Sequence, residues 1–351
     1  MDLLPSAEQL ELVGLASEFF AEQLPISKIR ERRGEPAAIT RKTWAAAAEL
    51  GLFGLSLPED AGGLGLGLDD EALLFREIGR ALAPGPFIAT VLGARLAALA
   101  GNAGLARSIA AGETMVALAQ RRGGDPVSGG PPESGPENRQ LTGQFDLFDV
   151  PEADYVLFTD PAGAGLAATP ALADVKPVDS IDPGTRLASA AADGAPLLAW
   201  LPAGAEPLRL RGLVLASASL TGISQAVTDL SVEYAKNRVQ FGRPIGVNQA
   251  IKHACVDMAI AAEAALEQTL FGAISLASGR PDAEFQVLAA SVVAGRAAID
   301  NSAASIQVHG GMGYTDEHDA HLYLKRAHVL SRFFGTSRGS LAGLLAADPA
   351  Q

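Results

Sequence analysis

Cysteine is nearly absent from this sequence, and so is any concentration of positive charge. The single cysteine, Cys255, excludes an intrachain disulfide and fits a reducing compartment. Against 40 aspartates and glutamates there are 27 lysines and arginines, which gives a net charge of −13, and the basic residues form no run. We therefore expect no binding to nucleic acid or to an anionic membrane surface.

Long uninterrupted apolar runs are missing as well. Near the amino terminus, Asp2, Glu8 and Glu11 interrupt any apolar stretch, so a signal peptide is not expected. The longest uncharged stretch, residues 212–228, is diluted by serines and threonines and falls short of the ~20 strongly apolar residues that a membrane span needs. We expect a cytoplasmic protein in which this stretch forms a buried core helix.

What the chain does have is helical periodicity over much of its length. In residues 1–112, Ser6 and Thr40 are each placed to cap the start of a helix, and the aspartates at 69–70 to cap a third. The glycine-rich segment 57–65 could be a phosphate cradle. It has no following Lys-Ser/Thr pair and no preceding strand, so we interpret it as an irregular connector.

Shorter apolar runs, separated by proline and glycine, replace this periodicity in residues 113–205. Such runs predict small antiparallel strands. The clearest are at 115–118, 155–158 and 197–201.

From residue 206 on the pattern is helical again. Gly279 followed by Pro281 separates two long helices, which should pack as part of a bundle. Cys255 lies on an apolar face of the first of them and is expected to be buried. The expected fold class is α+β and mostly α. The predicted domains are 1–112, 113–205 and 206–351.

The stretch that organises the chain is residues 233–249. Its first part continues a helix, Gly242 and Pro244 mark a turn, and a second helix should open at Gln249. Arg238 falls in the last turn of the first helix, where a guanidinium complements the helix dipole and offers a fork suited to phosphate. Because an arginine at a helix end is more often a capping charge, both interpretations stay open at this point.

Three motifs follow one another in a fixed order. They are Arg238-x-x-Phe241-Gly242-x-Pro244-Ile245 with Gln249, then Gln307-Val-His-Gly310-Gly311-Met-Gly313-Tyr314, then Gly335-Thr336. Together they resemble the motifs of the acyl-CoA dehydrogenase family. The resemblance implies an amino-terminal helical domain, a small middle β-domain and a carboxy-terminal four-helix bundle. It also implies FAD as cofactor and dehydrogenation of an acyl-CoA.

In that family, the arginine and phenylalanine of the first motif and the glutamine and glycines of the second contact the FAD of a neighbouring subunit. The resemblance therefore implies cofactor-binding roles for a set of residues in this chain. They are Arg238, Phe241, Gln249, Gln307, Gly310, Gly311 and Thr336.

The reaction needs a carboxylate base beside the thioester. Most members place a glutamate directly before the Gly-Thr pair, where this chain has Phe334. A minority place it near the start of the helix that leads to the arginine motif, where this chain has Gly212, with no acid between Glu206 and Asp229. Both positions lack a base, so no catalytic residue is predicted.

Other groups were weighed as substitutes. The acids that follow the glycine motif are more simply charges that favour a helix start: Asp316, Glu317 and Asp319. His309 has the chemistry of a base, but we favour a structural or cofactor-edge role for it. The spacing of three further histidines could suggest a metal site, yet surface histidines are the simpler interpretation: His318, His321 and His328.

The middle region departs from the family. Where the family has a Thr-Glu-Pro-x-Ala-Gly-Ser type and a Trp-Ile-Thr/Ser-Asn-Gly type of segment facing the flavin, this chain has different residues at 119–126 and 141–149. The segment 129–137 is rich in proline, glycine and serine and is expected to be mobile. We expect the domain to persist as a fold but not as a flavin site.

These observations favour a subunit of a heterotetramer. A homologous acyl-CoA dehydrogenase subunit would carry the catalytic glutamate, and this chain would complete the FAD site across the interface. The resemblance implies an acyl-CoA substrate, with a sterol side chain linked to CoA as one candidate, and electron-transfer flavoprotein as acceptor. The alternatives are a self-sufficient homotetramer with a relocated base and a structural subunit that binds no flavin.

Overall fold

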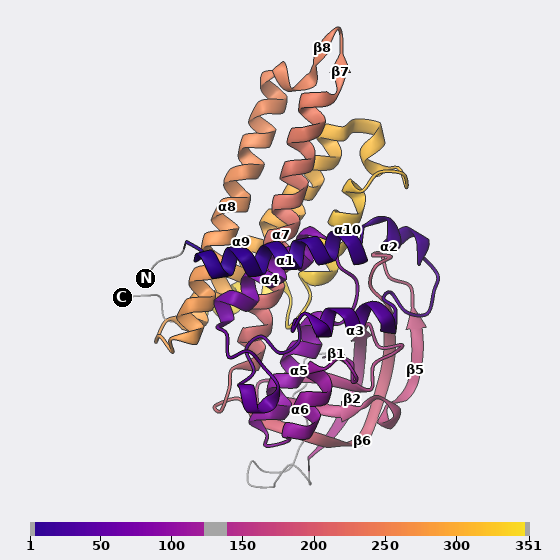
Figure 1. The fold of residues 1–351 in the computed structure, drawn as a ribbon, viewed down its shortest axis with the longest axis vertical. Coiled ribbons are helices and arrows are strands. Elements are labelled where there is room, and N and C mark those ends of the chain that lie inside the picture. Colours follow the sequence, from indigo (N-terminus) through magenta and orange to yellow (C-terminus); the bar gives the residue numbers. More distant parts are fainter. Residues whose placement is uncertain (1–3, 123–138, 348–351) are drawn as a thin grey trace. The chain divides into compact units, whose positions relative to one another are not determined.

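The computed structural model describes residues 4–122 and 139–347, which form two compact units (Figure 1). The first, called the bundle unit, joins segments that are far apart in sequence: 1–26, 68–83 and 213–351. The second, called the sheet unit, comprises 27–67 and 84–212. Helices at both ends of the chain and strands in its middle confirm the α+β class. Each unit draws on more than one predicted domain, and the predicted domain borders stay predictions.

Seven helices of the described residues contribute to the bundle unit. They are α1 (Ala7–Gln23), α4 (Leu68–Arg80), α7 (Leu208–Asn237, from residue 213 on), α8 (Gln249–Ala277), α9 (Ala283–His309), α10 (Ala320–Leu330) and α11 (Ser337–Ala346). The break between α8 and α9 falls at Gly279 and Pro281, as predicted. Figure 1 shows α7, α8 and α9 as long neighbouring rods.

Small polar side chains connect these rods from inside. Asn301 Nδ2 on α9 donates to Ser224 Oγ on α7 and to the Met258 carbonyl oxygen on α8, both at 2.7 Å. Ser231 Oγ on α7 donates to Ser305 Oγ on α9 at 2.9 Å. Buried polar groups that are paired in this way hold neighbouring helices in one register.

α4 and α7 cross at two glycines. A Cβ on Gly79 would lie 1.9 Å from the Ser219 carbonyl oxygen, and a Cβ on Gly222 would lie 1.9 Å from the Arg76 carbonyl oxygen. Neither position can hold a side chain without moving the helices apart. The stretch 212–228, which includes Gly222, is buried along most of its length, as predicted for a core helix.

The turn predicted between α7 and α8 is a short β-hairpin. β7 (Val239–Gln240) pairs antiparallel with β8 (Arg243–Pro244), and η4 (Ile245–Val247) leads on to α8. The two turn residues, Phe241 and Gly242, have φ of 52° and 78°. Positive φ at both positions is the geometry of a type I′ turn, which suits glycine and costs energy for a residue with a Cβ.

The sheet unit places helices against a six-stranded sheet. Its helices are α2 (Ser27–Glu31), α3 (Arg41–Glu49), η1 (Glu59–Ala61), α5 (Phe87–Leu99), α6 (Ala103–Ala110) and η3 (Thr169–Ala171). Its strands are β1 (Val116–Arg121), β2 (Gln140–Phe148), β3 (Tyr155–Asp160), β4 (Gly163–Ala168), β5 (Ala173–Val178) and β6 (Leu187–Pro202).

The strand order is β2-β1-β3-β4-β6-β5, and one pairing differs from the prediction. The prediction of antiparallel strands holds for most pairs but is wrong for β1 and β3, which run parallel, with Val116 opposite Tyr155. β2 returns antiparallel along one side of β1, and the chain then crosses to the other side of β1. β3 therefore starts from the same end of the sheet as β1.

An aromatic cluster forms part of the core of the sheet unit. The Trp44 ring stacks on Phe53 at 4.2 Å and lies 5.0 Å from Phe87 at the start of α5. The glycine-rich segment is the irregular connector that was predicted, with the short η1 inside it. A Cβ on Gly63 would lie 2.1 Å from the Leu57 carbonyl oxygen, so close packing explains this glycine without any phosphate.

Two of the three predicted helix caps are present. Ser6 caps α1 through a reciprocal capping box, and Thr40 caps α3 with its side-chain oxygen. Asp69 and Asp70 do not cap α4, because the helix begins one residue earlier. They lie in its first turn, where negative charge favours the helix, and accept from Gln9 Nε2 at 3.0 and 2.9 Å.

Candidate functional site

The arginine motif forms an exposed tip at the end of α7 and α8 (Figure 1). Phe241 sits at the turn of the hairpin and is 102% exposed, and Val239 and Val247 in the same segment are 54% and 45% exposed. Gln249 is exposed at the first residue of α8, as predicted. An aromatic ring held out of its own unit in this way is available for contact with another molecule.

Arg238 starts the hairpin rather than ending the helix. α7 ends at Asn237, so the prediction that Arg238 lies in the last helical turn is wrong by one residue. Its N–H donates to the Tyr234 carbonyl oxygen, and its carbonyl oxygen accepts from Ile245 N–H, both at 2.8 Å. The backbone is fixed, while the exposed guanidinium makes no hydrogen bond or ion pair within the described residues. It is free to bind an anion.

The glycine motif follows the last turn of α9. Gln307, Gly310 and Gly311 are exposed, and Gly310 has a φ of 61°. A Cβ on Gly310 would meet no atom within 4 Å, and one on Gly311 would meet only Tyr314 Oη at 3.9 Å. The backbone here is therefore open to the approach of a ligand. Gly313, by contrast, is buried against α9 and is needed for packing.

His309 lies under this turn and is buried, with 3% of the residue exposed. Its Nδ1 donates to the Ser305 carbonyl oxygen at 2.7 Å. Its ring centroid is 4.3 Å from that of Tyr234 on α7 and 4.3 Å from that of His318. Burial lowers the pKa of His309, so the ring is neutral near pH 7. A buried, stacked ring agrees with the structural role predicted for it rather than with a catalytic base.

Nothing near Tyr234 or His309 in the sequence predicts this stack. Tyr234 lies in the last turn of α7, and its carbonyl oxygen accepts from Arg238 N–H just beyond the helix end. The stack brings the arginine motif and the glycine motif together.

Thr336 is not brought to the same place. Its side chain caps α11 by accepting from Gly339 N–H at 3.0 Å. α11 packs on an earlier part of α9, where Ser340 Oγ lies 3.2 Å from Ser291 Oγ. A helix rises ~1.5 Å per residue. Gln307 therefore lies some 20 Å or more along α9 from this contact.

Neither of the two positions for a base holds an acid. Phe334 is buried, with 6% exposed and a φ of 60°, and its ring meets that of Phe333 edge to face at 6.4 Å. Gly212 is buried in the sheet unit. The nearest preceding acid, Glu206, accepts from Arg95 Nε at 2.8 Å, so it is engaged in an ion pair.

The acids near the glycine motif do not form a base site. Asp319 is the N-cap residue of α10, but its side chain makes no capping hydrogen bond. That role falls to His318, whose Nδ1 accepts from Ala320 N–H at 3.1 Å. Asp316 is exposed, and its carboxylate is 3.9 Å from His321 Nε2.

Two expectations about exposure need correction. His321 was expected at the surface but is buried, with 6% exposed, because it faces inward at the start of α10. Cys255 was expected to be buried but is half-buried, and burial raises its pKa. Within the described residues no group of three or more His, Cys, Asp and Glu side chains is placed to hold a metal.

The segments that stand at the family's flavin-facing positions fall on β1 and β2, which pair antiparallel. Their side chains are engaged with each other. The Arg121 guanidinium lies over the Phe145 ring at 5.1 Å from its centroid, and Arg122 Nε donates to Asp146 Oδ1. The segment 129–137, expected to be mobile, lies outside the described residues.

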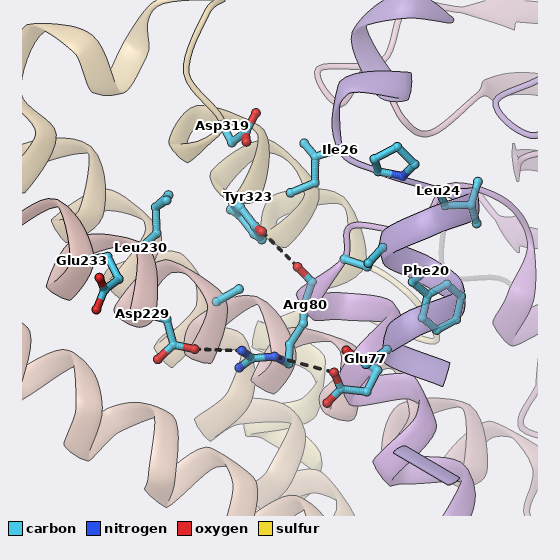
Figure 2. Close-up of a pocket in the computed structure, with 15 residues that line it drawn as sticks. Phe20, Leu24, Ile26, Glu77, Arg80, Asp229, Leu230, Glu233, Asp319 and Tyr323 are labelled. Atoms are coloured by element: carbon cyan, nitrogen blue, oxygen red, sulfur yellow. Dashed lines mark hydrogen bonds and ion pairs between the residues drawn. The ribbon is translucent and has the colours of Figure 1, made fainter. Parts of the chain in front are cut away.

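A pocket of about 500 Å³ lies within the bundle unit among α1, α4, α7 and α10 (Figure 2). Arg80 Nη2 donates to Asp229 Oδ2 at 2.8 Å, and Arg80 Nε is 3.7 Å from Glu77 Oε2. Tyr323 Oη on α10 donates to the Arg80 carbonyl oxygen at 2.9 Å. These contacts join α4, α7 and α10.

This pocket does not suit a phosphate. Arg80 is the single basic side chain among the lining residues described, against four carboxylates: Glu77, Asp229, Glu233 and Asp319. An excess of negative charge repels a nucleotide or a CoA group. The pocket is therefore not a phosphate site, and its contacts clamp α4, α7 and α10 together.

Comparison with known proteins identifies the chain. Models of the acyl-CoA dehydrogenase N-terminal and C-terminal domains match residues 6–108 and 211–342. Acyl-CoA dehydrogenase IpdE2 of Mycobacterium tuberculosis is 30% identical over 351 residues, which cover 97% of this chain and 98% of IpdE2. The chain belongs to the acyl-CoA dehydrogenase family. The prediction of an FAD-dependent oxidoreductase family is thereby confirmed.

A second relative and a solved structure agree. Acyl-CoA dehydrogenase FadE34 of Mycobacterium tuberculosis is 36% identical over 303 residues, 85% of this chain but 40% of FadE34, so the chain spans less than half of that relative. A structure of the Tcur3481-Tcur3483 steroid ACAD, in a G363A variant, superposes with a TM-score of 0.86 at 25% identity and covers 97% of both chains.

Two helices of this chain, α7 and α8, are long and apolar enough to cross a membrane by length and composition alone. The apolar window of α7 is 78% buried inside the protein, as in a core helix. That of α8 is 39% buried. The outer side of α8 leaves Val256 and Ile260 54% and 63% exposed.

The residues of this chain fit FAD at one place and not at another. At the tip, the unpaired guanidinium of Arg238 and the open backbone at Gly310 and Gly311 suit a phosphate-bearing cofactor that approaches from outside. On β1 and β2, Arg121 and Phe145 already cover each other where a flavin ring would need a surface. The second position does not fit the flavin.

Proposed function

We propose that this chain is the non-catalytic subunit of a heteromeric, FAD-dependent acyl-CoA dehydrogenase of the cytoplasm. A homologous partner subunit carries the catalytic glutamate and most of the flavin pocket. This chain completes that site from across the interface. The residues that it contributes are Arg238, Phe241, Gln249, Gln307, Gly310 and Gly311, with Thr336 from a separate place.

One contrast carries the proposal. The groups that would reach a neighbour's cofactor are present and point outward, with Arg238 unpaired among the described residues and Phe241 102% exposed. The groups that a self-contained site would need are replaced, with buried Phe334 at the position of the base and Arg121 over Phe145 at the flavin face. Exposed binding residues without a base suit a chain that completes another subunit's site.

Each contributed residue has a physical task. Arg238 can hold a phosphate with two parallel hydrogen bonds, which position the cofactor as well as bind it. Gly310 and Gly311 leave room for the cofactor to approach the backbone. Phe241 can cover an apolar ring and exclude water from it. When bound, FAD supplies the hydride acceptor for dehydrogenation between the α and β carbons of the acyl group.

An exposed apolar strip supports the interface. Val256 and Ile260 on α8 are one helical turn apart and 54% and 63% exposed, and the apolar hairpin tip precedes them in the chain. Apolar residues that recur on one exposed helix face are typical of a protein interface. A second bundle is the partner that such a face suits.

The relatives support the substrate class. The Tcur3481-Tcur3483 structure carries the names of two proteins and the description steroid ACAD. By analogy we assign to this chain a partner that is a different acyl-CoA dehydrogenase subunit and a substrate that is a steroid side chain linked to CoA. Electron-transfer flavoprotein is the expected electron acceptor.

The test is the FAD content of the complex when Arg238 is replaced. Charge-assisted hydrogen bonds are worth ~1.5–3 kcal/mol, so Arg238→Ala should weaken FAD binding about tenfold or more. Arg296→Ala is the control, because Arg296 is exposed on α9 and pairs with Asp300 of the same helix. Unchanged FAD in Arg238→Ala would favour a structural subunit without flavin contacts. Steady turnover of an acyl-CoA by the purified chain alone would favour a self-sufficient homotetramer.

A further inference from the structure

The two exposed segments assigned to FAD meet at one buried residue, His309. It is the last residue of α9 and directly precedes Gly310. Its ring contacts that of Tyr234, whose carbonyl oxygen accepts from Arg238 N–H. A continuous set of contacts therefore runs from the hairpin through Tyr234 and His309 to the glycine turn. The inference drawn from it rests on the function proposed above.

The His309 ring is held by one hydrogen bond and two ring contacts. A carbonyl oxygen can only accept, so His309 Nδ1 carries the hydrogen that it donates to Ser305 at 2.7 Å. Ser305 Oγ in turn accepts from Ser231 Oγ on α7 at 2.9 Å. The His309 ring also contacts that of His318, which caps α10, at 4.3 Å between centroids. The imidazole is thus locked among α7, α9 and α10.

We propose that His309 is a positioning residue that holds the hairpin and the glycine turn at the separation that one FAD requires. With 3% exposed it does not touch the cofactor. It acts through Tyr234 on Arg238 and through the backbone on Gly310 and Gly311. Two contact groups bind a ligand well only if their spacing is set beforehand, because otherwise binding must itself order them.

The chemistry of imidazole explains why histidine suits this position. A phenylalanine ring could stack on Tyr234 but could not donate to Ser305, so the ring would be held less firmly. An alanine would do neither and would leave a gap beneath Gly310. A comparison of histidine, phenylalanine and alanine at position 309 therefore distinguishes the contribution of ring stacking from that of the hydrogen bond.

The experiment compares His309→Ala, His309→Phe and the wild-type chain, with His328→Ala as control because His328 is exposed on α10. The first readout is hydrogen exchange at the Ile245 amide in the full chain alone, since the bond from Ile245 N–H to the Arg238 carbonyl closes the hairpin. The second readout is the dissociation constant of FAD from the complex with the partner, at a temperature well below unfolding.

A positioning role predicts a graded result in both readouts. His309→Ala should speed exchange at Ile245 and weaken FAD binding by about tenfold or more, by analogy with groups that orient metal ligands, whose loss weakens metal binding ~10–100-fold. His309→Phe should lie between alanine and wild type, and His328→Ala should match wild type. A Tyr234→Ala, His309→Ala double variant should be no worse than the more affected single variant, since both act through one contact.

A role in packing alone would give another result. His309→Ala would then lower the melting temperature, while exchange at Ile245 and the FAD dissociation constant below that temperature stayed at wild-type values. That outcome would overturn the proposal. If the wild-type complex held no FAD, the proposed function would fail. Exchange at Ile245 in the chain alone would still show whether His309 orders the hairpin.

Discussion

The guanidinium of Arg121 lies over the ring of Phe145, 5.1 Å from its centroid, across the pair formed by β1 and β2. Arg122 is likewise paired with Asp146. These strands stand where the acyl-CoA dehydrogenase family faces its flavin. In this chain the Arg121–Phe145 and Arg122–Asp146 pairs occupy this surface, which agrees with a sheet that is kept as a fold without a flavin site of its own.

Replacing Phe241 by glycine should have opposite effects on the stability of the chain and on its binding of FAD. A residue with a Cβ at a φ of 52° is strained by ~1 kcal/mol or more. Phe241→Gly should therefore raise the free energy of unfolding of the chain alone by about that amount and yet weaken FAD binding in the complex, because the ring is lost. Chemical denaturation and FAD titration measure the two effects.

The matched control is Phe241→Ala, which removes the ring but keeps the Cβ. It should leave stability near that of the wild type and weaken FAD binding as much as glycine does. If both variants kept wild-type FAD affinity, the exposed ring would have no part in the cofactor site.

The crossing of α4 and α7 gives a prediction about the bundle unit. Gly222→Ala would put a Cβ 1.9 Å from the Arg76 carbonyl oxygen, and overpacking of this kind typically costs ~1–3 kcal/mol. Gly295→Ala on α9 is the control, because a Cβ there meets no atom within 4 Å and alanine favours a helix by up to ~1 kcal/mol. The melting temperature should fall in Gly222→Ala and rise in Gly295→Ala. Equal shifts would contradict the crossing geometry.

The contacts that join α4, α7 and α10 in Figure 2 can be tested at the hydroxyl of Tyr323. Tyr323→Phe removes the bond to the Arg80 carbonyl oxygen and should cost ~1 kcal/mol of unfolding free energy. Tyr314→Phe should cost little, because Tyr314 is 71% exposed. No loss in Tyr323→Phe would mean that this bond does not hold α10 to α4.

His309 predicts a dependence of stability on pH. Burial lowers its pKa most, the neighbouring His318 lowers it further, and the bond to Ser305 opposes both. The unfolded chain takes up the proton near pH ~6.5, whereas the folded chain takes it up only at lower pH. Below pH ~6.5 the unfolded state therefore binds more protons, and the free energy of unfolding should fall as the pH falls.

In His309→Phe this loss should be smaller between pH ~6.5 and ~5. Asp282 does not interfere in that range. Its pKa is lowered from 3.8 to about 2, mainly by hydrogen bonds from Arg280 and Gln286, so the stability that it contributes is lost only at more acidic pH. Identical pH profiles for the variant and the wild type would show that His309 does not titrate on unfolding.

Local signals in the sequence predicted local structure well. Ser6 and Thr40 offer side-chain oxygens at the right position before an apolar face, and both cap helices. Gly279, with a φ of 62°, and Pro281 both favour the end of a helix, and the break between α8 and α9 falls there. The motifs also predicted that Arg238 lies at the junction of α7 and α8, because Gly242 and Pro244 nearby indicate a turn.

What the sequence could not predict depends on contacts between distant segments. β1 and β3 pair in parallel because the chain crosses from one side of β1 to the other after β2. No residue near Val116 predicts this crossing. The burial of His321, which is 6% exposed, depends on how α10 packs in the fold, and its local sequence does not specify that packing. The positive φ of Phe241 runs against the preference of its residue type, so a turn was predicted but not a strained hairpin.

The central claim is that this chain completes a partner's FAD site and lacks one of its own. The most direct measurement is the flavin absorbance of the chain purified alone and after co-expression with acyl-CoA dehydrogenase chains that carry a glutamate before their Gly-Thr pair. The account predicts a colourless chain and a yellow complex with one FAD for each pair of unlike subunits. One FAD per subunit in the chain alone, with oxidation of an acyl-CoA, would contradict it.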